Sequence, residues 1–224
     1  MQIFLILFAV TLGFTMWGRK KFRRVYDEEL QNTIGSKITG AELARKILES
    51  KGITNIEIVK GKGILPDFYD PAKRRLTLSP QHFGGSSYSG LGVAAHEAGH
   101  IIQHVDGHRP LLWRVSAVKA TVFLSLPVIA AGIFLIIMPG MKATGLALLA
   151  LGWPLIAITN LITMPIEMDA SERAKKRLGQ LKVFKNLDER VGIERVIDAA
   201  GANYIDGVFT ALSWIRSIVP NLFR

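Results

Sequence analysis

Residues Ser89–His104 read SGLGVAAHEAGHIIQH and contain an HExxH motif at positions 96–100. Small and apolar residues surround His96-Glu97-Ala98-Gly99-His100 on both sides, which is typical of a helix that faces a core. On such a helix His96 and His100 lie one turn apart on one face. Their two imidazoles can therefore bind one zinc ion, with bonds of about 2.0–2.1 Å. Glu97 follows the first of them and can act as the general base for an attacking water molecule.

The composition excludes several other kinds of site. The chain has 224 residues, no cysteine and a formal net charge of +10. Without cysteine there is no disulfide, Cys-ligated zinc, iron–sulfur cluster or cysteine nucleophile, so a metal must be bound by His, Asp or Glu. The positive charge suits nucleic acid or an anionic membrane surface. Because no nucleic-acid motif accompanies it, we expect no nucleic-acid partner.

Two long uncharged stretches predict a membrane protein. Met1–Gly18 has no charged side chain and precedes the basic residues 19–24, and residues 120–166 contain only one charge, Lys142. A helix of about 20 apolar residues crosses a bilayer, so we expect an N-terminal transmembrane helix and a transmembrane hairpin that turns at Pro139–Lys142. Basic residues follow both expected spans, which places these flanks in the cytoplasm.

The expected fold class is a mainly α protein with a small β-sheet, an HExxH helix and transmembrane helices. Five segments are expected: a transmembrane helix (1–18), a cytoplasmic domain with the HExxH helix (19–119), a transmembrane hairpin (120–166), a cytoplasmic helix with the third zinc ligand (167–195) and a C-terminal helix (196–224). The last segment either spans the membrane or lies at its interface, which leaves three or four spans.

The cytoplasmic domain carries local signals of its own. Thr39 and Glu42 form a capping box, which predicts a helix that ends near Gly52. Alternating apolar residues predict strands over 55–60 and Arg74–Leu78. Asp67–Pro71 is typical of a turn. The strand Arg74–Leu78 is also a candidate for pairing with an extended substrate, through residues Arg74, Arg75, Leu76, Thr77 and Leu78.

A catalytic zinc site needs a third protein ligand. His104 lies about 12 Å of helix rise from His96, which is too far for the same ion. His82 and His108 have the character of surface or loop histidines. Glu167 is the best candidate, because it shares a helix face with small residues that allow close packing against another helix, namely Ala170, Ser171 and Ala174. On this helix Asp169 would point about 200° away from Glu167.

The chain resembles the YugP-like membrane zinc metallopeptidases, which are similar to the HtpX-type membrane proteases. The resemblance covers nearly the whole chain and includes Thr39–Ala44, Asp67–Pro71, Ala94–His104 and Pro165–Ala174. It implies one zinc ion per chain bound by His96, His100 and Glu167. In HtpX-type enzymes an Asp of the last block supports a zinc-binding His, and Ser171 occupies that position here. Ser171 can exchange a hydrogen bond but cannot supply a charge.

These observations predict a membrane-embedded zinc endopeptidase that acts on peptide or membrane-protein segments at the cytoplasmic face of a bacterial-type plasma membrane, with the lipid bilayer as its surroundings. Glu97 would be the general base, with His104 or Tyr204 as candidates for stabilising the oxyanion. One alternative is a zinc-stabilised membrane scaffold without turnover, in which Glu97 would have no role. A transporter is a weaker alternative, because the stretch 120–166 contains no Asp, Glu, Arg or His.

Overall fold

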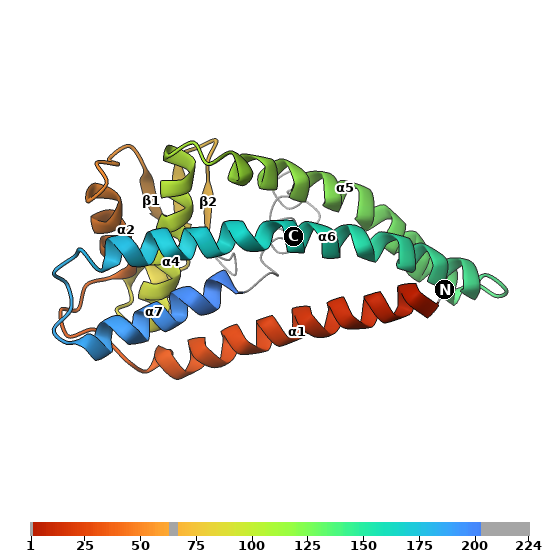
Figure 1. Cartoon of the computed structure of the whole chain (residues 1–224), viewed down its shortest axis with the longest axis horizontal. Coiled ribbons are helices and arrows are strands. Elements are labelled where there is room, and N and C mark those ends of the chain that lie inside the picture. Colours follow the sequence, from red (N-terminus) through yellow and green to blue (C-terminus); the bar gives the residue numbers. More distant parts are fainter. Residues whose placement is uncertain (1, 63–66, 203–224) are drawn as a thin grey trace. The chain divides into compact units, whose positions relative to one another are not determined.

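The computed structural model of the chain describes residues 2–62 and 67–202. The described part is mainly helical with a small sheet, as predicted. In chain order its elements (Figure 1) are α1 (Gln2–Leu30), α2 (Gly40–Glu49), β1 (Glu57–Lys60), β2 (Phe68–Asp70), β3 (Arg75–Leu78), α3 (Pro80–Gly84), α4 (Tyr88–Val105), α5 (Arg109–Ile137), α6 (Lys142–Leu178) and α7 (Leu187–Gly201).

The described residues divide into two compact units. Residues 2–18 and 112–163 form the hairpin unit, and residues 19–111 and 164–202 form the site unit. The site unit is discontinuous in sequence, because the chain leaves it after Leu111 and returns to it at Met164.

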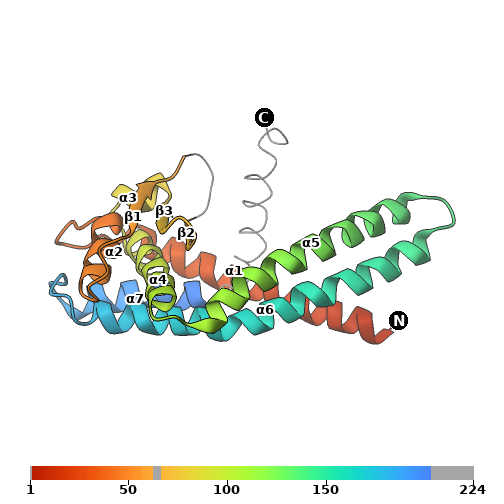
Figure 2. The same cartoon turned by 90° about the horizontal axis from the view of Figure 1, so that it is seen from above.

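The hairpin unit contains most of α5 and the first part of α6. Figure 2 shows these two helices running antiparallel and joined by a short turn, which matches the turn predicted at Pro139–Lys142. Gly140 has a φ of 75° in this turn, a conformation that glycine adopts without strain. The helical hairpin is therefore present where the sequence predicted one.

The predicted transmembrane character of these helices is wrong. In the part of the chain that the structure describes, none of the helices combines the length and the apolar character needed to cross a bilayer. The prediction was made from nearly uncharged stretches with about 20 apolar residues each. The fold class is thus corrected to mainly helical with a small sheet, without the transmembrane helices.

The site unit contains a three-stranded sheet in which β3 lies in the middle. β3 is parallel to β1 and antiparallel to β2. Its side chains Leu76 and Leu78 are fully buried, as expected for the inward face of an alternating strand. Both edges of β3 are already paired, so addition of a substrate strand to this sheet would fall to an outer strand.

β2 lies where the sequence predicted a turn over Asp67–Pro71, so this prediction was wrong for residues 68–70. The backbone is extended there because it pairs with β3. The turn follows at 71–74, where the Asp70 carboxylate accepts hydrogen bonds from the backbone N–H groups of Ala72 and Lys73 at 3.0 and 3.2 Å. Such a side-chain turn explains why the composition suggested a bend slightly too early.

Helix α4 forms the centre of the site unit and packs against α2 and α7. Every residue from Ser89 to Gln103 except Val93 is buried. On α2 the predicted stripe of Leu43, Ile47 and Leu48 is fully buried, and the predicted capping box begins the helix. A helix buried on nearly all sides needs small and apolar residues around its whole circumference, and the sequence of α4 supplies them.

Helix α7 begins earlier than the C-terminal helix predicted from residue 196. The Asn186 side chain caps α7 by accepting a hydrogen bond from the backbone N–H of Glu189 at 2.9 Å. Residues 203–224, including most of the predicted segment, lie outside the described residues. The predicted helix 167–195 is replaced by two elements, because α6 continues to Leu178 and α7 starts at Leu187.

Candidate metal centre

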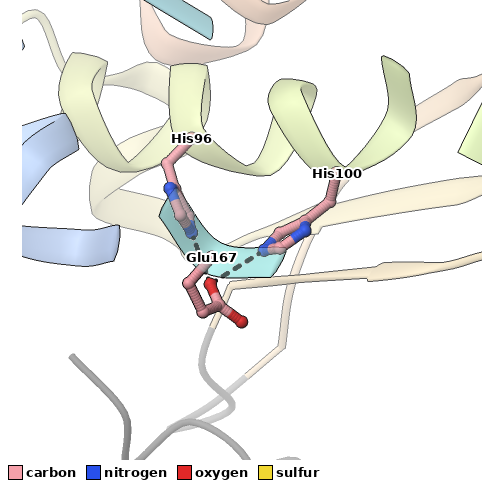
Figure 3. Close-up of side chains that lie close together, drawn as sticks. All are labelled: His96, His100 and Glu167. Atoms are coloured by element: carbon pink, nitrogen blue, oxygen red, sulfur yellow. Dashed lines mark hydrogen bonds and ion pairs between the residues drawn. The ribbon is translucent and has the colours of Figure 1, made fainter. Parts of the chain in front are cut away.

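Three buried side chains from two helices converge in the site unit (Figure 3). His96 and His100 project from α4, and Glu167 projects from α6. The Glu167 Oε2 atom lies 3.0 Å from His96 Nε2 and 3.1 Å from His100 Nε2. Each of the three residues exposes 7% or less of its surface. The sequence therefore identified the residues that the fold brings together.

A glycine contact brings the two helices close enough for this arrangement. A Cβ atom added to Gly99 would lie 2.1 Å from the carbonyl oxygen of Ala170 on α6, so a larger residue does not fit. The small residues predicted to face another helix are buried as expected, with exposures of 0% for Ala170, 3% for Ser171 and 0% for Ala174. Glu167 reaches the two histidines because the backbones of α4 and α6 are in direct contact beside it.

His96 is held by Ser171. The Ser171 hydroxyl donates to the carbonyl oxygen of Ile197 at 3.0 Å, so its oxygen accepts a hydrogen bond from His96 Nδ1 at 3.1 Å. Ser171 thus occupies the supporting position that the resemblance suggested. It provides a neutral acceptor for the Nδ1–H group of His96.

His100 is held by Gln103, a residue that the sequence analysis did not single out. The Gln103 amide oxygen lies 3.0 Å from His100 Nδ1. Its amide nitrogen donates to the Ile166 carbonyl oxygen at 2.8 Å and to Asp169 Oδ2 at 2.7 Å. Asp169 was expected to point away from the zinc-binding helix. In fact its carboxylate reaches α4 one turn beyond the two histidines.

The hydrogen-bond network fits a cation between the three side chains. Ser171 and Gln103 each offer an oxygen acceptor to one Nδ1 atom, so both histidines carry their proton on Nδ1. The Nε2 atoms of the two neutral rings then present lone pairs to the same carboxylate oxygen of Glu167. Three acceptor atoms that converge in a buried space repel each other unless a cation lies between them.

The dimensions and the ligand types of this cluster fit zinc. Tetrahedral bonds of about 2.0–2.1 Å place ligand atoms about 3.3 Å apart, so the observed separations need only a few tenths of an ångström of adjustment. Two imidazoles and one carboxylate leave the fourth position open, as catalytic zinc sites do. Among the described residues, this is the one group of His, Asp or Glu placed to hold a metal.

Three further polar residues were predicted for the site, and the structure describes two of them, Glu97 and His104. Glu97 is buried on α4 between the two zinc-binding histidines in sequence. The Nδ1 atom of His104 shares a hydrogen bond of 2.8 Å with the hydroxyl of Tyr69 on β2. Burial, together with the positive charge of Arg74, lowers the pKa of His104, and burial raises the pKa of Tyr69 to about 12. Tyr204 lies outside the described residues.

The two remaining histidines were both predicted to be surface or loop residues. His82 is instead buried on α3, between Asp67 at 2.6 Å and the hydroxyl of Tyr26 at 2.6 Å. Burial and the nearby Asp67 charge raise the pKa of Tyr26 to about 12. His82 therefore connects Tyr26 of α1 with Asp67, the residue before β2. The local sequence around His82 does not indicate these distant partners. His108 is half-buried, with its Nδ1 atom 3.9 Å from Asp169 Oδ2.

An HExxH helix and a buried Glu on a second helix give a donor set typical of zinc metallopeptidases. Residues 3–220 match a protein family described as "Putative neutral zinc metallopeptidase", and the chain belongs to this family. It is 31% identical over 215 residues to the "Putative membrane protease YugP" of Bacillus subtilis (strain 168), which covers 94% of this chain and 92% of the relative. No solved structure matches the chain. The resemblance seen in the sequence and the zinc cofactor are thereby confirmed.

Proposed function

We propose that this chain is a zinc-dependent endopeptidase in which Glu97 is the general base. The observation that carries the proposal is the convergence of His96, His100 and Glu167 as three acceptors in one buried space, beside a glutamate that a purely structural site would not need. Membership of a zinc metallopeptidase family supports the same reaction class.

Each residue then has one role. When bound, zinc supplies Lewis-acid chemistry that activates water and polarises a carbonyl group. Glu97 accepts the proton of the attacking water and passes it to the nitrogen of the leaving amine. Ser171 and Gln103 hold the two imidazoles so that their Nε2 atoms face Glu167. His104, held by Tyr69, remains our candidate for a polar group near the developing oxyanion.

The test of this mechanism is Glu97→Gln. We expect the variant to bind zinc as wild type does and to hydrolyse a fluorescently labelled unfolded protein about 10²–10⁴ times more slowly, since the general base contributes factors of that size. Glu172→Gln is the matched control, because Glu172 is an exposed carboxylate on α6. Hydrolysis by Glu97→Gln at the wild-type rate would contradict the mechanism. Zinc binding without hydrolysis in wild type would favour the scaffold.

The ligand set is tested by the zinc content of Glu167→Ala. Wild type should hold about one zinc ion per chain, and the variant should lose it during gel filtration because a catalytic site needs its third protein ligand. Zinc retained at the wild-type level in Glu167→Ala would mean that another residue is the third ligand.

We further propose that this peptidase works at the cytoplasmic side of a bacterial plasma membrane, on peptide or membrane-protein segments. The relative named a membrane protease supports this location. So do the exposed apolar side chains of α5, including Trp113, Phe123 and Ile137. Because the chain has no cysteine, a single Cys at exposed Glu172 gives a clean test. A membrane-impermeant thiol reagent should label it in inverted vesicles and not in intact cells, and the reverse pattern would contradict the orientation.

A further inference from the structure

The strongest unassigned feature beside the metal centre is the amide of Gln103. We infer that Gln103 and Asp169 form a positioning pair that orients His100 and sets its distance from Glu167, an inference that rests on the proposed zinc site. Gln103 has no exposed surface and lies one turn after His100 on α4. Its amide oxygen faces His100, and its amide nitrogen donates to two acceptors on α6.

The partners of Gln103 fix which way its amide points. The nitrogen faces two acceptors, the carbonyl oxygen of Ile166 and the carboxylate of Asp169. A flipped amide would place its oxygen against both of them, which is repulsive in a buried space. The amide oxygen therefore faces His100 Nδ1, and that atom must carry the proton. His100 is thereby left with its Nε2 lone pair directed at the metal position.

Asp169 is itself held in place by a chain of charges. Arg173 Nε donates to Asp169 Oδ2 at 2.6 Å, and the Arg173 guanidinium also donates to Asp106 at 2.6 Å. Lys51 lies 3.3 Å from the other oxygen of Asp106. The Gln103 amide is thus anchored to a carboxylate that cannot easily turn away.

The same amide also connects the two helices that carry the zinc ligands. Ile166, which accepts from Gln103, immediately precedes Glu167 on α6. A single side chain on α4 therefore links the ring of His100 to the backbone segment that presents the third ligand. Ser171, which supports His96, lies on α6 itself, and its hydroxyl passes a hydrogen bond on to Ile197 of α7. Both histidines are thus supported by contacts with α6, but in different ways: His96 meets a side chain of α6, whereas Gln103 joins the ring of His100 to the α6 backbone next to Glu167.

The test compares Gln103→Met, Asp169→Asn and the control Glu172→Gln with wild type. Met has a volume close to that of Gln but cannot make the three hydrogen bonds. Zinc affinity is measured by competition with a chelator. The Nδ1–H groups of the histidines are observed by nuclear magnetic resonance in zinc-loaded protein labelled with nitrogen-15 histidine. The chain has five histidines, so the ring signals can be resolved.

We expect Gln103→Met to raise the zinc Kd about 10–100-fold, the usual effect of removing a partner of a metal-binding histidine. The His100 Nδ1–H signal should disappear through exchange with water, while that of His96 persists. Asp169→Asn should raise the Kd less, because its side-chain oxygen still accepts from Gln103, and Glu172→Gln should change neither quantity.

A zinc Kd within about twofold of wild type in Gln103→Met, or an unchanged His100 signal, would overturn the inference. If Gln103→Met does not fold, Asp169→Ala decides, because it removes the side-chain acceptor of Gln103 altogether: an unchanged Kd together with an unchanged His100 signal would overturn the inference. Failure of the proposed zinc site is distinguishable, because in that case wild type itself would bind no zinc.

Discussion

Helix α6 makes a close glycine contact in each of the two units, and only one of these contacts lies beside residues that can bind a metal. In the site unit, Gly99 of α4 lies against Ala170 of α6. In the hairpin unit, a Cβ added to Gly145 of α6 would lie 2.6 Å from the carbonyl oxygen of Gly132 on α5. Both contacts bring backbones together in the same way.

The difference lies in the residues around each contact. Next to Gly99 stand His96, His100 and Glu167, all buried and all able to bind a metal. The described residues of the hairpin unit contain no comparable group. Close helix packing is therefore a general device of this chain. What distinguishes the functional contact is a set of buried ionisable side chains, which are costly to bury unless something pairs with them.

The largest effect should come from Gly99→Ala. The added methyl group would meet a backbone carbonyl oxygen at 2.1 Å, so α4 and α6 must separate and Glu167 is drawn away from the histidines. We expect the zinc Kd to rise more than about 100-fold, beyond the effect of losing one supporting hydrogen bond.

Zinc content after gel filtration measures this effect. Gly84→Ala is the control, since a Cβ at Gly84 meets no atom within 4 Å. Wild-type zinc content in Gly99→Ala would show that the close contact is not required for the site.

A smaller effect on zinc is expected from Ser171→Ala. This change leaves the His96 Nδ1–H group and the Ile197 carbonyl oxygen without their partner. The zinc Kd should rise about 10-fold, at the lower end of the range for such partners, because the serine is neutral. Chelator competition measures it. A larger loss than in Gln103→Met would reverse the ranking of the two supports.

Gly145→Ala should separate packing from chemistry. Overpacking against Gly132 costs about 1–3 kcal/mol, and the better helix propensity of alanine offsets about 1 kcal/mol of this. The free energy of unfolding should therefore fall by up to about 2 kcal/mol in denaturant titrations. The zinc Kd should stay at the wild-type value, and a change in it would link the hairpin packing to the site.

The smallest effect concerns pH. Burial and Arg74 lower the folded-state pKa of His104, so the unfolded chain binds the proton more readily. The stability that comes from keeping this ring neutral is present above its unfolded pKa of about 6.5 and is lost as the pH falls through the lower folded-state pKa. His104→Gln should therefore lose less stability than wild type between about pH 7 and pH 5, as measured by thermal unfolding. Parallel pH profiles would contradict this origin.

The sequence predicted those parts of the site that depend on local spacing. His96 and His100 are placed by one helical turn, and Glu167 by the small residues that share its face. Gln103 lies three residues after His100, which could have suggested a contact with its ring. Its other partners lie 63 and 66 residues away in the chain, and no local pattern encodes them.

The same reason explains the structural errors. β2 forms because residues 68–70 pair with β3, while their own composition favours a turn. His82 is buried through Tyr26, which lies 56 residues earlier. The transmembrane prediction, made from nearly uncharged stretches of about 20 apolar residues, is contradicted for the described helices. Helix caps and buried stripes, as in α2, were predictable since their partners lie within one or two turns.

The separation of the ligands along the chain also sets an order in time. Glu167 follows His100 by 67 residues, and the intervening residues 112–163 belong to the other unit. At synthesis rates of about 5–20 residues per second, the third ligand is added roughly 3–13 s after the histidine pair. A growing chain therefore passes through a period in which it carries two ligands and no complete site. The metal site can therefore be completed only after Glu167 has been added, long after both histidines are in place.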